Sequence, residues 1–263
     1  MRIASSTLLA ALFAGCLATA QSLQSQVLQT TSGTGFRGAP YSARETTVDM
    51  KTTADGTRYT NTYVNLLWRD AEGRTRQEHL EKSRSGADIH SVVITDPVAG
   101  VYLKWSFGDE SMQKVMTIWP LPARQRVTAP PPDQSNAAAH SPDALSKSEP
   151  RPCGAGCTIQ TERLAAQEIN GIYAEGRRTT RSFKAGTAEN GQDLVVTVVN
   201  EIWISPELGI IVRHITDDSR TGRNATEVTE IVRGDPDPAL FTAPDGYRWR
   251  DMRSGSATSE SLP

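Results

Sequence analysis

Residues 194–204 read LVVTVVNEIWI, and this stretch gives the strongest strand signal in the chain. Val, Ile and Trp fill most of it, and these residues favour the pleated backbone of a strand. Ser205, Pro206 and Glu207 then supply a turn, and a second β-branched run follows at 208–216. After a polar turn containing Gly222, residues 225–233 alternate between polar and apolar side chains. Three successive strands joined by short turns predict an antiparallel meander.

The first half of the chain repeats this pattern. Turn residues at 54–57, 69–74 and 96–100 separate runs that are β-prone. The strands predicted there cover residues 44–53, 58–68, 75–82, 90–95, 101–107 and 115–119. Asn170-Gly171 is the strongest short hairpin signal, whereas 158–167 fits either a short strand or a helical turn. Because no long stretch has a helical period, we predict a mainly β fold whose sheet is mainly antiparallel.

The sequence divides into a leader, one domain and a tail. We predict a signal peptide at 1–20, a flexible leader at 21–39, a single β-rich domain at 40–250 and a flexible tail at 251–263. Residues 120–152 are rich in Pro, Ala and Ser, and we predict that they form a disordered insertion within that domain. A proline-rich recognition segment is the functional alternative for this insertion.

The N-terminus predicts export. Arg2 precedes a short apolar run, and that run lacks the roughly 20 apolar residues that a membrane helix needs. Cleavage after Ala20 would leave a free periplasmic or secreted protein with no transmembrane span. The alternative is lipidation at Cys16, because LFAGC (residues 12–16) resembles the lipobox of bacterial lipoproteins, and an outer-membrane lipid anchor would follow.

The other two cysteines suit an oxidising compartment. Cys153 and Cys157 lie four positions apart with two glycines between them, so we predict a disulfide. The spacing is not the C-x-x-C of thioredoxin-like redox sites. The four histidines, which are scattered without ligand spacing, predict no metal site, and no cofactor is expected. These histidines are His79, His90, His140 and His214.

Charge and motifs narrow the function classes. The formal net charge of -2 gives no electrostatic reason to expect nucleic acid as a partner. The chain contains no G-x-S-x-G, H-E-x-x-H, P-loop or G-x-G-x-x-G pattern. His214 lies near Asp217 and Asp218, but no nucleophile stands out beside it. We therefore expect a non-catalytic protein.

Four tryptophans lie in or at the end of predicted strands. They could line an apolar groove for a lipid, a hydrophobic peptide or a glycan, or they could form ordinary core. The tryptophans concerned are Trp68, Trp105, Trp119 and Trp203.

Several segments carry a family resemblance. WRDAEGR (68–74), ITDPVAG (94–100), EIWISPELG (201–209) and DPDPALFTAPDGY (235–247) together resemble an uncharacterised family of exported acidobacterial proteins. The strand run and the closing LFTAPDGY (240–247) also resemble, more weakly, the periplasmic lipoprotein-carrier (LolA-like) superfamily. That second resemblance implies a curved antiparallel sheet or half-barrel, with few short helices, around a cavity that binds acyl chains.

These observations favour an exported, non-catalytic binding or carrier-like protein of the cell envelope that holds an apolar ligand in a curved sheet. One alternative is a structural or signalling protein that contacts an envelope protein through its sheet edges. The other alternative is a hydrolase whose site is assembled from scattered residues.

Overall fold

The computed structural model describes residues 38–53, 55–110, 112–122, 146–186, 194–253 and 258–261. The predicted signal peptide, the lipidation candidate Cys16, most of the predicted leader and residues 123–145 of the predicted insertion lie outside these ranges. Within them, the one helical element is a 3-10 turn, η2 (Pro238–Phe241), and no helix is long and apolar enough to cross a membrane.

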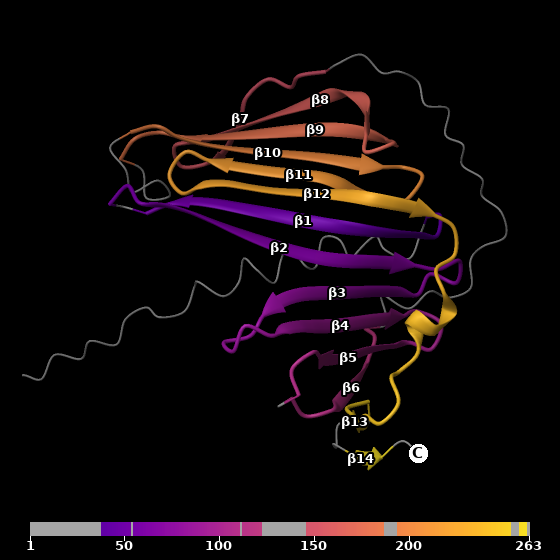
Figure 1. Ribbon diagram of the computed structural model, residues 1–263. Helices are drawn as coiled ribbons and strands as arrows, with labels where there is room; N and C mark the ends of the chain where they lie inside the picture. Colours follow the sequence, from indigo (N-terminus) through magenta and orange to yellow (C-terminus); the bar gives the residue numbers. More distant parts are fainter. Residues whose placement is uncertain are drawn as a thin grey trace, which may run out of the picture.

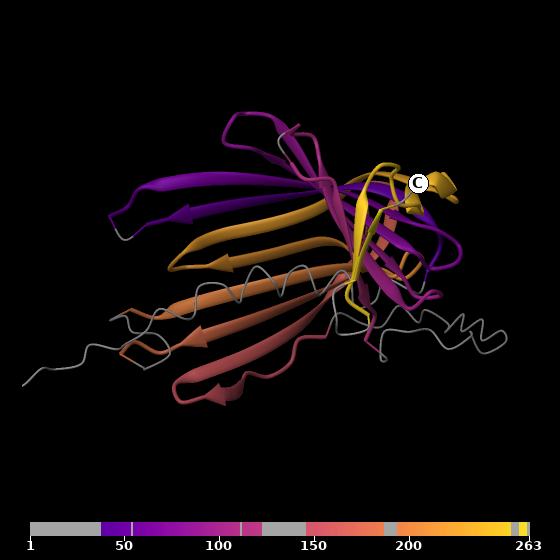
Figure 2. The same cartoon turned by 90° about the horizontal axis from the view of Figure 1, so that it is seen from below.

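All the strands belong to one curved sheet (Figures 1 and 2), so the prediction of a mainly β fold is confirmed. In spatial order the fourteen strands are β14, β13, β6, β5, β4, β3, β2, β1, β12, β11, β10, β9, β8 and β7. The strands are β1 (Tyr41–Thr52), β2 (Arg58–Arg69), β3 (Thr75–Lys82), β4 (Asp88–Asp96), β5 (Val101–Phe107), β6 (Val115–Pro120), β7 (Arg151–Gly154), β8 (Cys157–Ile169), β9 (Ile172–Phe183), β10 (Val196–Ser205), β11 (Ile210–Asp218), β12 (Gly222–Arg233), β13 (Arg248–Asp251) and β14 (Thr258–Ser261).

Two meanders meet in the middle of this sheet. The first runs outward from β1 to β6, and the second starts at the opposite edge with β7 and returns to β12, which pairs with β1. All neighbouring strands are antiparallel except β6 and β13, which are parallel. The pairing of β1 with β12 joins the two halves of the chain into one sheet.

Turn chemistry explains the best-defined hairpin. Asn170 and Gly171 both adopt positive φ, 51° and 77°, as a two-residue hairpin of the twist-matching type requires. The hairpin prediction is therefore confirmed. Residues 158–167 fall within the long strand β8, so the strand interpretation holds and the helical turn does not. Ser146 and Ser148, from the end of the predicted insertion, bond to the backbone of β8.

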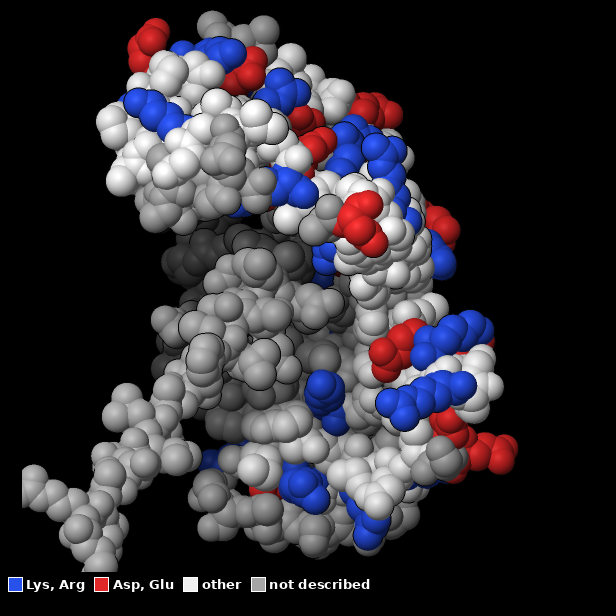
Figure 3. All heavy atoms as spheres, turned by 90° about the vertical axis from the view of Figure 1, so that its left-hand side faces the viewer, with Lys and Arg blue, Asp and Glu red and all other residues white. Residues whose placement is uncertain are grey.

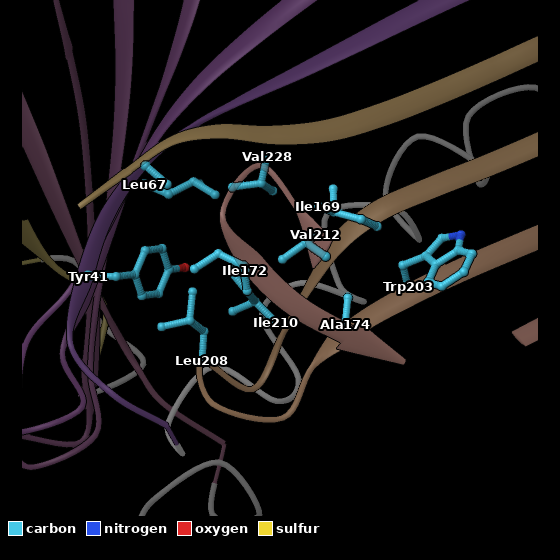
Figure 4. Packing of buried hydrophobic residues seen from close by; sticks show 11 residues of the cluster. Tyr41, Leu67, Ile169, Ile172, Ala174, Trp203, Leu208, Ile210, Val212 and Val228 are labelled. Atoms are coloured by element: carbon cyan, nitrogen blue, oxygen red, sulfur yellow. The ribbon is translucent and has the colours of Figure 1, made fainter. Parts of the chain in front are cut away.

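The first core cluster lies where β1, β2 and β12 meet the β8–β9 hairpin and the β10–β11 turn (Figure 4). The side chain of Arg69 donates to the carbonyl oxygens of Ala39 and Leu208, which holds the β10–β11 turn against the end of β2. Asn170, at the tip of the β8–β9 hairpin, donates 2.8 Å to the carbonyl oxygen of Val228 in β12. The cluster comprises Tyr41, Ala43, Leu67, Ile169, Ile172, Ala174, Trp203, Leu208, Ile210, Val212 and Val228.

The second core cluster lies under a strap, which we define as residues 235–247. Arg76 donates 3.0 Å to the carbonyl oxygen of Leu240, and the hydroxyl of Tyr247 donates 2.9 Å to the carbonyl oxygen of Ser106. Phe241 and Tyr247 are thereby pressed onto the buried side chains of β4, β5 and β6. Those buried partners are Val92, Ile94, Trp105 and Met116.

Candidate ligand-binding face

Strand register divides the side chains of the sheet between two faces. Residues directly opposite one another share a face, so His79, Asn65 and Glu45 lie together across β3, β2 and β1. Thr47 and Thr226 lie on the same face, where their hydroxyl oxygens are 2.8 Å apart. We call this side the hollow face and the opposite side the outer face.

Several ion pairs lie on the outer face. Arg213 binds Glu227 at 3.0 Å, and Arg178 binds Glu201 at 2.8 Å and Glu162 at 3.4 Å. Figure 3 shows a molecule that is hollowed on one side and carries interleaved basic and acidic groups along the other. We infer that the face with these ion pairs is the convex one and that the face of Glu45 and Asn65 looks into the hollow.

The half of the outer face that β3, β4 and β5 form is covered by the strap. The strap lies over β3, β4 and β5 there, and the guanidinium of Arg76 lies 5.4 Å from the ring of Trp68 and 5.5 Å from the ring of Trp105. Glu78 accepts from Arg76 at 2.5 Å and lies 2.6 Å from His90 Nδ1. Arg76, Glu78 and His90 bond to one another beneath the strap, although Nε of Arg76 is buried without a hydrogen-bond partner among the described residues. This half of the outer face therefore serves the packing.

A hydrogen-bonded chain of side chains crosses the centre of the hollow face. Asn65 Nδ2 donates 2.7 Å to Glu45 Oε1, and His79 Nδ1 lies 2.9 Å from Asn65 Oδ1. Because an amide oxygen can only accept, Nδ1 of His79 carries the proton. The ring of Tyr63 stacks against that of His79, with centroids 6.4 Å apart.

The carboxyl group at the end of this chain is in an unusual environment. Glu45 is only 6% exposed, and burial raises the pKa of its carboxyl group above the ordinary value, although the hydrogen bond from Asn65 opposes this. No ion pair joins Glu45 to a cation among the described residues. A buried carboxyl with a displaced pKa on a concave surface is a candidate functional group, because ordinary packing gains little from it.

A second polar group lies on β10 and β11. Asn200 Nδ2 donates 2.8 Å to His214 Nε2 and 3.0 Å to Thr216 Oγ1. Nε2 of His214 therefore accepts, which requires a neutral ring. Burial lowers the pKa of His214, in agreement with that neutral state.

Apolar and aromatic side chains complete the hollow face. Tyr102 and Trp119 stack with ring centroids 4.8 Å apart and planes 9° apart. Val93, Val198 and Ile202 are half-buried on the same face by their register. A surface of this kind can bind a ligand with both apolar and hydrogen-bonding parts.

The structure does not bring the four tryptophans of the expected apolar groove together. Trp105 is buried and Trp68 half-buried in the cluster beneath the strap, whereas Trp203 belongs to the first core cluster. Trp119 alone lies on the hollow face, stacked on Tyr102. Most of this set is therefore core, which was the other interpretation of the sequence.

The remaining predicted site residues are placed as follows. Cys153 and Cys157 form the predicted disulfide, with their Cα atoms 5.1 Å apart, at the end of β7 and the start of β8. Within the described ranges, no three His, Cys, Asp or Glu side chains converge as metal ligands would. Sequence reasoning missed Glu45 and Asn65. The signal for them was the 53–58 turn, whose geometry sets the register that makes these two residues neighbours.

Comparisons with known proteins leave the family open. No protein-family description matches the chain, and no curated protein sequence does. Among solved structures, a LolA superfamily protein from Nitrosomonas europaea matches over 83% of this chain and 97% of its own, with 8% identity and a TM-score of 0.25.

Proposed function

We propose that this protein is an exported, non-catalytic binding or carrier-like protein whose ligand lies against the hollow face. One observation carries the proposal. The strap covers half of the outer face, whereas the hollow face combines the buried polar side chains of Glu45 and Asn65 with half-buried apolar ones. The signal-like N-terminus supports export to the periplasm.

The chemistry of this face supports binding more than hydrolysis. The side-chain amides of Asn65 and Asn200 donate hydrogen bonds to Glu45 and His214, and both hydrogen bonds hold the side chains in fixed positions. Among the described residues, His79 has no hydrogen bond to a serine, threonine or cysteine, and His214 Nε2 lies 3.4 Å from the hydroxyl of Thr216 in the same strand. The ligand we propose has an apolar part, for Val198, Ile202 and the aromatic rings, and a polar part that reaches Glu45.

Native mass spectrometry would test this proposal on protein produced with its own leader in a Gram-negative host. We expect an extra non-covalent mass that is lost on denaturation. The purified chain should also bind the apolar fluorophore 1-N-phenylnaphthylamine. If neither the bound mass nor the fluorophore signal appears, the carrier proposal fails, and contact with an envelope protein becomes the better candidate.

Matched variants in one strand place the ligand. Thr46 and Thr47 are neighbours in β1, both half-buried, and they lie on the outer and hollow faces respectively. Thr47→Trp should block the fluorophore by filling the hollow, whereas Thr46→Trp should leave binding intact. Equal effects of the two substitutions would argue that the hollow face is not the site.

A further inference from the structure

Five of the exposed cations on the hollow face form two groups, one toward each edge of the sheet. Lys104, Thr117 and Arg250 are directly opposite one another across β5, β6 and β13. Arg248 lies one row away, opposite Val115. At the other end, Arg177 and Arg181 project from β9 on the same face, opposite Ile202 and Val198. Figure 3 shows basic groups both above and below the hollow.

Several cations of the outer face, unlike these five, have carboxylate partners. On the outer face, Arg178, Arg213 and Arg223 each bind a carboxylate at between 2.8 and 3.7 Å. These five cations form no ion pair with any described residue, whereas two others on the same face do: Lys51 binds Asp49 at 2.9 Å and Arg163 binds Glu175 at 3.8 Å. Positive charge that has no carboxylate partner among the described residues favours an anionic partner.

The distance between the two groups of cations favours a partner with an extended surface. From β13 to β9 there are ten strand steps, which at about 4.8 Å a step is roughly 48 Å along the curved sheet. A small anion or a single headgroup could contact one group only. An extended anionic surface could contact both groups at once, across the opening of the hollow.

The aromatic pair beside the first group points to a lipid surface. Tyr102 and Trp119 stack one row from Lys104 and Thr117, on the same face as Arg250. Amphipathic rings of Tyr and Trp, placed next to Lys and Arg, suit the boundary between lipid headgroups and acyl chains.

We propose that the two groups of cations dock the protein onto an anionic phospholipid membrane, with the hollow opening toward the lipid. The cations supply the attraction and the aromatic pair supplies an interfacial anchor. This orientation places the ligand site next to the bilayer from which an apolar ligand would enter or leave. The transfer of a ligand between this site and the bilayer rests on the proposed function, but the docking itself does not.

Vesicle co-sedimentation tests the docking. The chain should bind vesicles of phosphatidylethanolamine and phosphatidylglycerol, should ignore vesicles of phosphatidylcholine, and should be released by salt. Binding to both kinds of vesicle alike would indicate an acyl anchor or apolar insertion and would overturn the proposal. Binding to soluble dextran sulfate without binding to anionic vesicles would point to a glycan instead and would also overturn it.

Paired substitutions locate the contact. Arg248→Gln with Arg250→Gln should lower the partition coefficient about 25-fold, or about fivefold for each cation. The control removes the same charge from the outer face by Arg58→Gln with Arg223→Gln, and it should change binding little. Equal losses in both double variants would mean that only the net charge matters, which contradicts the proposal.

The second group of cations gives an independent check. Arg177→Gln with Arg181→Gln should weaken vesicle binding by a similar factor, and all these sites are exposed, so circular dichroism should show unchanged folding. An unaffected partition coefficient would show that only one end of the face docks and would refute the two-sided contact. Fluorophore binding, measured in parallel without vesicles, should stay normal. If the fluorophore fails to bind the parent protein while the vesicle result stands, the proposed function fails and the docking remains.

Discussion

Replacement of Gly176 by alanine tests the packing at Trp203. Gly176 in β9 lies directly opposite Trp203 in β10, and the indole ring covers it. A Cβ atom at position 176 would lie 2.6 Å from Cζ3 and 2.7 Å from Cε3 of that ring. The ring would have to withdraw, yet it is only 5% exposed and its Nε1 donates 2.7 Å to Glu201.

The expected cost follows from opposing terms. Overpacking a core by one methyl group costs about 1–3 kcal/mol, and weakening the bond from Trp203 to Glu201 adds about 1 kcal/mol. The φ of Gly176 is not positive, so alanine meets no backbone strain and recovers about 0.5–1 kcal/mol of chain entropy. We therefore expect Gly176→Ala to lower the free energy of unfolding by about 1–3 kcal/mol.

A double-mutant cycle, measured by urea unfolding, tests whether the cost of Gly176→Ala comes from its contact with Trp203 or from a general intolerance of substitution at position 176. Trp203→Leu removes the ring, so Gly176→Ala in that background should be neutral or slightly stabilising. Far-UV circular dichroism would follow unfolding in all four proteins. If the two substitutions are additive, so that Gly176→Ala costs as much without the indole as with it, the packing argument is wrong.

Three further perturbations have expected outcomes. Glu45→Gln keeps the bond from Asn65 but removes the titration. Folding raises the pKa of Glu45, so the unfolded chain releases this proton at a lower pH than the folded chain does. The free energy of unfolding of the parent should therefore fall as pH rises above 4.5. Urea titrations at several pH values should show a smaller fall for the variant. Phe241→Ala should cost about 3–5 kcal/mol in the same assay by emptying the cluster beneath the strap, and a cost under 1 kcal/mol would mean that the strap is dispensable. Replacing both Cys153 and Cys157 by serine should cost about 2 kcal/mol at most, because the bridged residues are only four positions apart, and a total loss of folding would contradict that estimate.

The sequence predicted individual strands well and their assembly poorly. Runs such as 75–82 and 101–107 match β3 and β5, because β-branched residues and turn signals act over a few residues. The pairing of β1 with β12 joins residues that are far apart in the chain, such as Thr47 and Thr226, and no local signal encodes it. The parallel pairing of β13 with β6 depends likewise on the path of the strap.

The hollow face was hidden from the sequence for a related reason. Register irregularities between Ser42 and Arg44, and between Trp203 and Ile204, change which side chains share a face. The alternation of polar and apolar residues along one strand cannot locate these register irregularities. Trp203 therefore looked like a groove residue although it packs on Gly176, and Glu45 looked like one more polar residue in a threonine-rich strand.

An antiparallel sheet can leave one face in contact with water, so the fold alone does not require a further layer over the hollow face. The strap and the two core clusters cover part of the sheet, but between them the hollow face holds Glu45 and Asn65, polar groups from which little packing energy comes. A ligand seated there would cover these polar groups of the hollow face. Binding to the folded chain alone raises its stability by mass action, so ligand removal should lower the melting temperature. The hollow face would then contribute to stability through its ligand, and an unchanged melting temperature after ligand removal would contradict a ligand at this face.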